Sequence, residues 1–204
     1  MKTLKLLIAL LCGAVIASAQ DNEYNYPVDK ETGKITYEKT KTVAGTQHNL
    51  FKYGLQFVAS QNFNREVATK TKMRKVFYTT IVITTPITYQ DEEQGKIFGN
   101  GFFDFEYRGK QRFVVTFSYK IYVKDQEYRY VFTDFVVKEF VGAGEPIAKR
   151  HINSATAPNS SARILSFPLE EFIERSKYAD SDQIFKDNIK QLKTQLAKAM
   201  AGDL

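Results

Sequence analysis

Residues 113–123 alternate between apolar and mostly polar side chains, and this alternation constrains the fold more than any other feature. In an extended strand, neighbouring side chains point to opposite faces, so one face of this segment is apolar and the other mostly polar. Antiparallel strands that are covered on one side only have this pattern. We therefore expect a sheet with one buried face, to which this segment contributes Phe113, Val115, Phe117, Tyr119, Ile121 and Val123.

Further strand patterns lie on both sides of this segment. We expect strands over residues 34–43, 96–105 and 127–140, and another marked by Phe77, Ile81, Ile83, Ile87 and Tyr89. Pro86 lacks a backbone donor, which indicates an edge, a bulge or the end of that strand. The strand over 127–140 has two faces that the pattern does not rank: Tyr128, Tyr130, Phe132 and Val136 against Val131, Phe135 and Val137. Residues 97–140 contain fourteen of the 28 Phe and Tyr residues, which places the core there.

Helical periodicity appears before and after the strands. Thr46 is a suitable cap for a helix with Leu50, Tyr53, Phe57 and Val58 on one side. A helix follows near Pro168, and a longer one begins at about Ser181 and ends at Gly202. Its apolar stripe is Phe185, Ile189, Leu192, Leu196 and Met200. The order predicts an α+β fold: a curved antiparallel sheet of about five strands (strand, helix, four strands) packed with one helix, plus C-terminal helices.

The first nineteen residues are typical of a secretory signal peptide. Lys2 and Lys5 precede an apolar run over residues 6–16 and a small-residue end, so we expect cleavage between Ala19 and Gln20. A lipoprotein signal using Cys12 is the alternative, but Leu11 is larger than the residue that normally precedes a lipidated cysteine. We expect secretion across the inner membrane, to the periplasm or the extracellular medium.

The mature chain would have no cysteine, because Cys12 lies within the signal. Disulfides, thiol nucleophiles and thiolate metal ligands are then excluded. Its net charge would be 27 − 23 = +4 after loss of Lys2 and Lys5, which is weak support for a nucleic-acid partner, and we expect none. We divide the chain into residues 1–19 (signal), 20–140 (α+β domain), 141–166 (linker) and 167–204 (helical tail).

Three stretches resemble a known family: YPVDKETGKITY (26–37) with the helix after it, GKIFGNGFF (95–103) and QEYRYVFTDFVV (126–137). They are similar to bacterial secreted proteins grouped as domain of unknown function 4468, with a TATA-binding-protein-like fold. The resemblance covers residues 26–140, and the chain departs from it in a longer stretch that includes residues 70–88. It implies this fold and an envelope address. It implies no activity, and the fold name does not imply DNA binding.

Gly99-Asn100-Gly101 is the only stretch that resembles a cofactor motif. A dinucleotide fingerprint needs a third glycine and a following helix, and a P-loop needs Gly-Lys-Ser/Thr. Here a strand pattern follows over residues 102–105. We therefore expect the glycines to serve a bulge, a bend or a close backbone approach, letting the sheet curve over the helix that contains Phe57. No cofactor is expected.

Metal and catalytic motifs are also missing. His48 and His151 are far apart in sequence and have no ligand pattern around them. We expect Asp91-Glu92-Glu93 to form a solvated turn, and Glu170, Glu171 and Glu174 to lie early in a helix. Asp104 and Asp134 interrupt aromatic strands, so either could be a general acid if buried, or a sheet-face residue that meets water or lysine. Ser118 and Ser166 lack a nucleophile elbow.

An aromatic face is the best candidate for recognition. Tyr119, Tyr122, Tyr128, Tyr130 and Phe132 could bind a sugar, a lipid or a protein, or they could pack in the core. We expect a non-enzymatic binding or interaction module whose partner is an unknown envelope protein. The alternatives are a carrier of a small apolar ligand or lipid in a helix-grip-like cavity, a hydrolase using Asp104 or Asp134, and a tail that forms a coiled coil or docks on a partner.

Overall fold

The structure is a computed structural model that describes residues 26–61, 63, 69–73, 76–80, 85–108, 111–141, 163–175 and 181–203. The predicted signal peptide, its cleavage site at Ala19 and Gln20, Cys12, His151 and most of the predicted linker lie outside these ranges. None of the helices in the described ranges has the length and apolar character needed to cross a membrane.

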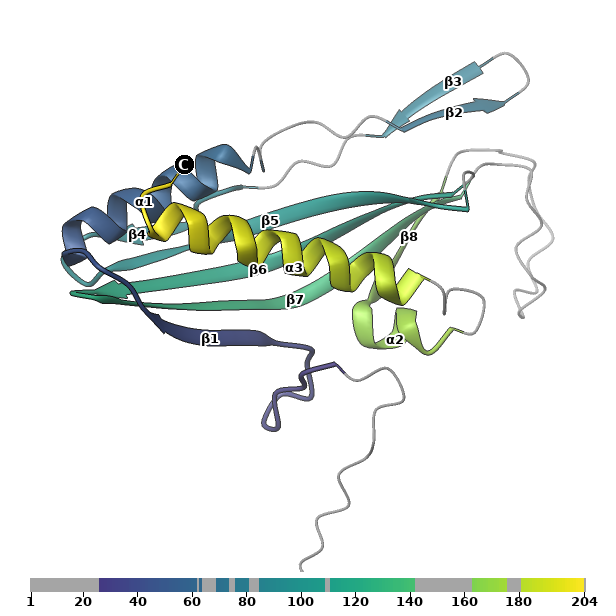
Figure 1. The fold of residues 1–204 in the computed structure, drawn as a ribbon. Helices are drawn as coiled ribbons and strands as arrows, with labels where there is room; N and C mark the ends of the chain where they lie inside the picture. Colours follow the sequence, from purple (N-terminus) through teal and green to yellow (C-terminus); the bar gives the residue numbers. More distant parts are fainter. Residues whose placement is uncertain are drawn as a thin grey trace, which may run out of the picture.

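Six strands form one antiparallel sheet in the order β1-β7-β6-β5-β4, with β8 also paired to β7 (Figure 1). The described elements are β1 (Tyr37–Thr42), α1 (Gln47–Ser60), β2 (Thr69–Met73), β3 (Val76–Thr80), β4 (Tyr89–Asp91), β5 (Lys96–Tyr107), β6 (Gln111–Lys124), β7 (Glu127–Val141), β8 (Arg163–Pro168), α2 (Leu169–Ile173) and α3 (Ser181–Met200). The α+β class and the antiparallel sheet are thus confirmed.

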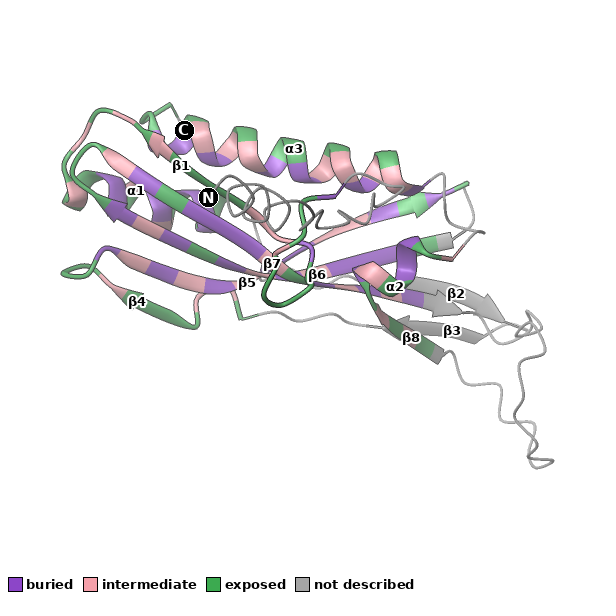
Figure 2. Ribbon diagram, turned by 90° about the horizontal axis from the view of Figure 1, so that it is seen from below, coloured by how far each residue is buried: buried purple, intermediate pink, exposed green. Residues whose placement is uncertain are grey.

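Two helices, α1 and α3, cover one face of the sheet (Figure 1). Thr46 caps α1 as expected: its side-chain oxygen accepts the Asn49 backbone N–H at 3.3 Å. The whole predicted stripe of α3 is buried. It packs against the chain's own sheet, so this stripe is not available for a coiled coil. Beneath the helices lie the alternating apolar residues of β6, each 5 % exposed or less (Figure 2).

A β-bulge explains why the two faces of β7 could not be ranked. Ser118 pairs with Thr133 and Thr116 with Val136, so Asp134 and Phe135 together oppose Phe117. Asp134 has φ 56°, the left-handed conformation found in bulges of this kind. The extra residue shifts the alternation by one. On the face that the helices cover, the buried residues are therefore Tyr128, Tyr130 and Phe132 before the bulge, and Phe135, Val137 and Glu139 after it. Val131, on the other face, is also buried.

The outer edge of β7 is completed by two strands that lie end to end. β1 pairs with residues 127–132 and β8 with residues 136–141, on either side of the bulge. The predicted linker (141–166) therefore ends earlier, because β8 begins at Arg163. The sequence does not predict β8, because this six-residue strand pairs with a strand that is distant in sequence and no local turn joins the two.

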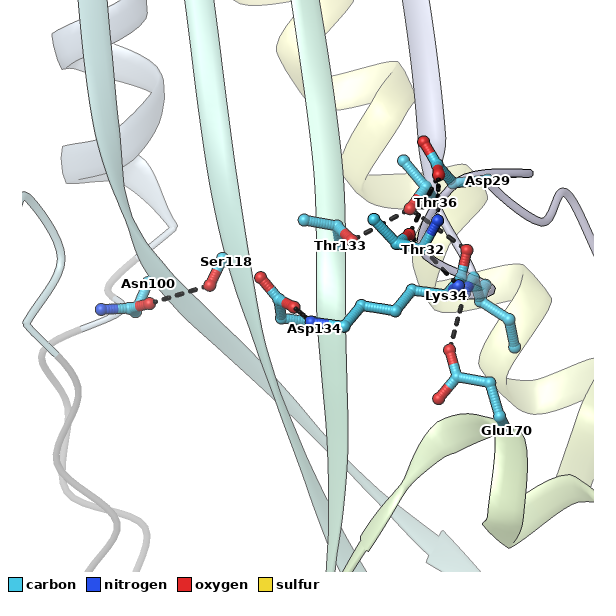
Figure 3. Close-up of polar contacts among 10 residues, drawn as sticks. Asp29, Thr32, Lys34, Thr36, Asn100, Ser118, Thr133, Asp134 and Glu170 are labelled. Atoms are coloured by element: carbon cyan, nitrogen blue, oxygen red, sulfur yellow. Dashed lines mark hydrogen bonds and ion pairs between the residues drawn. The ribbon is translucent and has the colours of Figure 1, made fainter.

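A turn over residues 29–35 fills the gap between β1 and β8 (Figure 3). Lys34 Nζ lies 2.5 Å from Asp134 Oδ1, and Thr36 shares a 2.9 Å hydrogen bond with Thr133. The backbone N–H of Ile35 donates to Glu170 Oε1 of α2 at 2.6 Å. The N-terminal segment is therefore fastened to β7 and to α2.

The strand predicted from Phe77 to Tyr89 is wrong as a single element. β2 and β3 pair with each other in a separate two-stranded sheet, and β4 begins only at Tyr89. Ile81 and Ile83 lie outside the described residues. Pro86 does lie at the edge of the main sheet, because the flanking Thr85 and Thr88 hydrogen-bond to Asn100 and Phe98 of β5.

Candidate functional site

Gly99 and Gly101 lie inside β5, which is followed by β6 and not by a helix. A Cβ atom on Gly99 would lie 1.7 Å from the carbonyl oxygen of Pro86, and one on Gly101 would lie 2.5 Å from the ring of Phe117. The hydroxyl of Tyr119 also donates to the Pro86 carbonyl. The two glycines therefore allow the backbone of Pro86 and the ring of Phe117 to approach β5 closely, which is one of the roles expected for them. They do not form a phosphate-binding loop.

The two aspartates of interest each have a basic partner. Asp104 Oδ2 accepts N–H groups of Arg112 at 3.0 and 2.5 Å, and its side chain is 15 % exposed. Asp134 is paired with Lys34, and its side chain is 43 % exposed. Both therefore match the sheet-face alternative. Ser118 Oγ donates to Asn100 Oδ1 at 3.3 Å (Figure 3). Ser166 lies in β8.

The other ionisable groups singled out in the sequence form turns and helix ends. His48, in the first turn of α1, pairs with Glu92. Asp91 accepts the Gln94 backbone N–H at 2.9 Å, and this bond holds the Asp91 pKa below its usual value. Glu170 and Glu171 occupy the first turn of α2. Within the described ranges, His, Cys, Asp and Glu form no group of three suited to a metal ion.

The predicted recognition surface does not form as one surface. Tyr119, Tyr128, Tyr130 and Phe132 are all 4 % exposed or less and belong to the core, as the packing alternative expects. Burial raises the pKa of Tyr128 to about 12 and the pKa of Tyr119 well above its usual value. Only Tyr122 lies on the other face of the sheet, where it is half-buried.

A smaller aromatic row surrounds Tyr122 on that outer face. Tyr89 of β4 lies 5.4 Å from Phe98 of β5, and Phe98 lies 5.3 Å from Tyr122 of β6, measured between ring centroids. Tyr89 is 42 % exposed, and the other two rings are partly exposed. Adjacent strands thus present three rings in contact on a face that α1 and α3 leave open.

Two cations border the row. The guanidinium of Arg129 lies 5.1 Å from the Tyr122 ring centroid and 2.7 Å from Glu38 of β1. Lys120 stands opposite Phe98 in the β5–β6 register and is exposed. No carboxylate in the described part of the chain pairs with Lys120. We call Tyr89, Phe98, Tyr122, Lys120 and Arg129 the outer aromatic patch.

The sequence does contain a signal for this patch. In the alternation of β6, Tyr122 falls on the same face as Thr116, Ser118 and Lys120, which is the polar face. Its position on that face indicates partial exposure, which the structure shows. Tyr89 and Phe98 could not be added to it from sequence, because the β4–β5 register brings them together only in the folded sheet.

The comparisons with known proteins concern the fold. The family model described as "Domain of unknown function (DUF4468) with TBP-like fold" matches residues 37–138. A crystal structure of a DUF4468 family protein from Bacteroides ovatus is similar, with a TM-score of 0.54, 13 % identity, and coverage of 85 % of this chain and 90 % of that one. A TBP-like protein from Parabacteroides distasonis gives a TM-score of 0.51, 11 % identity, and coverage of 85 % and 96 %. No curated protein matches the chain.

Proposed function

The chain belongs to the family of the domain of unknown function DUF4468 with TBP-like fold, and we propose that it is a non-enzymatic protein-interaction module secreted to the bacterial envelope. The outer aromatic patch is the observation that carries the proposal. Its three rings are held by their neighbours on adjacent strands and are still partly exposed. Aromatic and arginine side chains are enriched where proteins bind each other, because they bury large area at low entropic cost.

The charges of the patch indicate the chemistry of the partner. Arg129 is already paired with Glu38, whereas Lys120 projects beside the rings without a carboxylate from the described residues. A partner that covers the rings would remove water from Lys120, which is costly unless it supplies an acidic side chain. The partner is therefore a protein surface that brings an Asp or Glu to Lys120 and apolar groups to the rings.

The pairing of the candidate acid–base residues with other side chains supports a non-enzymatic role. A general acid or base must be able to exchange a proton with a substrate, and a partner of opposite charge opposes this exchange. Asp104, Asp134 and His48 are each engaged by another side chain, namely Arg112, Lys34 and Glu92. Two of these pairs lie on the outer face of the sheet, and the third joins α1 to the turn before β5.

Packing between the helices and the sheet favours an interaction module over a carrier of an apolar ligand. Phe57 of α1, Leu196 and Met200 of α3 and Tyr119 and Ile121 of β6 are 0–1 % exposed within one continuous core. These side chains occupy the space that a helix-grip ligand would need. No observation on the described residues supports the carrier.

The envelope address rests on residues 1–19, with their basic start, apolar run and small residues before Gln20. N-terminal sequencing of the protein released from the periplasm should begin at Gln20. A chain that retains Met1, or one that stays with the cytoplasmic fraction, would contradict this part of the proposal.

Site-specific crosslinking tests the interaction. A photoreactive phenylalanine analogue is placed at Tyr122, and at Thr194 on the exposed side of α3 as a control. We expect one defined envelope-protein adduct from position 122 and none from position 194. The identified partner is then purified and titrated with the parent and with Lys120→Glu, which should bind at least ten times more weakly, about 1.4 kcal/mol. Equal adducts from both positions, or equal affinity of the two proteins, would refute the assignment of this surface.

A further inference from the structure

A second site lies where α3 passes over the middle of β5, at the edge of the sheet. The end of α1, the middle of β5 and one flank of α3 line an open pocket of about 200 Å³. It shares no residue with the outer aromatic patch. We propose that this α3–β5 pocket binds a single neutral sugar ring, either free or at the end of a glycan.

Side-chain amides form the rim of the pocket. Asn188, Gln191 and Gln195 are spaced by three and four along α3, so they lie on one flank beside the buried stripe. Gln61, the C-cap of α1, faces them from the other helix. An amide can donate and accept at once without bearing charge, which suits hydroxyl groups that also do both.

Part of this hydrogen-bonding capacity is available for a ligand. Asn188 Nδ2 donates to the Ile184 carbonyl at 2.8 Å, an arrangement that fixes the side chain and leaves Oδ1 as an acceptor. Gln191 and Gln195 make no side-chain hydrogen bond within the described residues. The side-chain amides of the rim offer more hydrogen-bond donors and acceptors than a single peptide group of a bound peptide could pair with. A sugar ring carries several hydroxyl groups and can therefore pair with several of these amides at once.

Aromatic rings form the floor. Phe103 is partly exposed, and its ring is held in place by Phe117 at 6.1 Å and by Phe185 at 5.6 Å. The face of a sugar ring that bears C–H groups packs well on such a ring, while its hydroxyls point outward to the rim. A wholly apolar ligand would instead leave the rim amides without partners.

The charge and the size of the pocket further restrict the class of ligand that it can bind. Of the described residues in its lining, only Asp104 is ionisable, and it is paired with Arg112. Among the described residues, no basic side chain lines the pocket, so none of them recognises a phosphate or a carboxylate. Its volume is below the range of about 300–1,000 Å³ that is typical of sites for drug-sized ligands, so it has room for one ring.

Ligand-observed saturation-transfer NMR on the purified exported protein tests this assignment. The panel contains neutral monosaccharides, their methyl glycosides, short neutral oligosaccharides, N-acetylated amino-acid amides and inorganic phosphate. We expect transfer to the ring protons of at least one neutral sugar. Preference for the monosaccharide indicates a free sugar, and preference for the oligosaccharide indicates a glycan end. Transfer to the amino-acid amides alone would overturn the assignment in favour of a peptide, and transfer to phosphate alone, or to nothing, would refute it.

Variants then locate the binding. Gln191→Ala and Asn188→Ala together should weaken the sugar at least tenfold, and Phe103→Leu should weaken it by a similar factor. Gln183→Ala removes an amide from α3 away from the pocket and should leave the affinity unchanged. Thermal unfolding of each variant shows that it is folded. Binding that is equally strong in the rim variants and in the control would place the sugar elsewhere and overturn the proposal.

Discussion

Lys34 Nζ and Asp134 Oδ1 lie 2.5 Å apart, although a hundred residues separate them in the chain. Lys34 comes from the turn that precedes β1, and Asp134 from the bulge of β7. The pair therefore joins the N-terminal segment to the point where the alternation of β7 changes phase. Both side chains are about half exposed, so water screens most of the attraction between them. Its position matters more than its strength.

The backbone conformation of Asp134 should matter more than its charge. Asp134→Val places a β-branched residue at φ 56° and removes the ion pair, and should lower the free energy of unfolding by about 1–3 kcal/mol. Asp134→Gly keeps the conformation accessible and should cost less than about 1 kcal/mol. Urea denaturation of both variants measures the difference. Equal losses would mean that the ion pair, and not the left-handed backbone, makes aspartate suitable there.

Gly99 should be intolerant of any side chain. In Gly99→Ala the new methyl group would meet the Pro86 carbonyl and the Tyr119 hydroxyl, which forces residues 85–88 away from β5. We expect a loss of about 2–3 kcal/mol, in the upper part of the range for overpacking. Hydrogen exchange should show lost protection at the Thr88 and Asn100 amides. Gly33→Ala has open space around its Cβ and should leave those two amides protected. Unchanged protection in Gly99→Ala would disprove the close approach.

The C-terminal helix should be indispensable to stability. Leu196 is fully buried between α3 and the sheet, so Leu196→Ala should destabilise the protein by about 2–5 kcal/mol. Thr194→Ala, on the exposed side of the same helix, should change stability by less than about 0.5 kcal/mol. Chemical denaturation of the two variants provides the comparison. A small effect at Leu196 would mean that α3 is a separable tail.

Stability should fall at alkaline pH because of the buried tyrosines. Burial raises the pKa of Tyr128 to about 12, whereas an exposed tyrosine titrates near 10. The folded protein therefore retains protons that the unfolded chain releases, so this contribution is intact below about pH 10 and is lost as the pH rises towards 12. Denaturation midpoints measured between pH 8 and 11.5 should fall less steeply for Tyr128→Phe than for the parent. Tyr122→Phe, on the outer face, is the control, and identical slopes for all three proteins would reject the explanation.

The parts of the fold that depend on local patterns could be predicted from the sequence. The Thr46 cap, the stripe of α3 and the alternation of β6 each involve neighbours within one element, and all three are present in the structure. Elements that depend on distant partners could not. β8 exists because it pairs with β7, and the strand expected between Phe77 and Tyr89 is divided between two sheets.

The candidate sites were hidden for the same reason. Alternation separates the two faces of a strand but does not show which face a helix covers. The predicted recognition surface therefore combines Tyr122 with four residues of the core, namely Tyr119, Tyr128, Tyr130 and Phe132. The amides of α3 resemble any solvated helix flank in sequence, and only their apposition to β5 forms a pocket. The bulge at Asp134 left a visible trace, since apolar residues occur on both faces of β7 around it, but the pattern alone does not locate the extra residue.

The end-to-end placement of β1 and β8 along β7 has a consequence for biogenesis. Both strands pair with the same late segment, although one comes before the rest of the sheet in the chain and the other comes after it. A polypeptide delivered from its amino terminus, by a ribosome or by a translocation channel, releases β1 long before β7 is there to receive it. The β5–β6–β7 meander can assemble as soon as it emerges, because its strands are joined in succession. β1 therefore emerges first but joins the sheet only after β7 has emerged, so it is among the last strands to be incorporated.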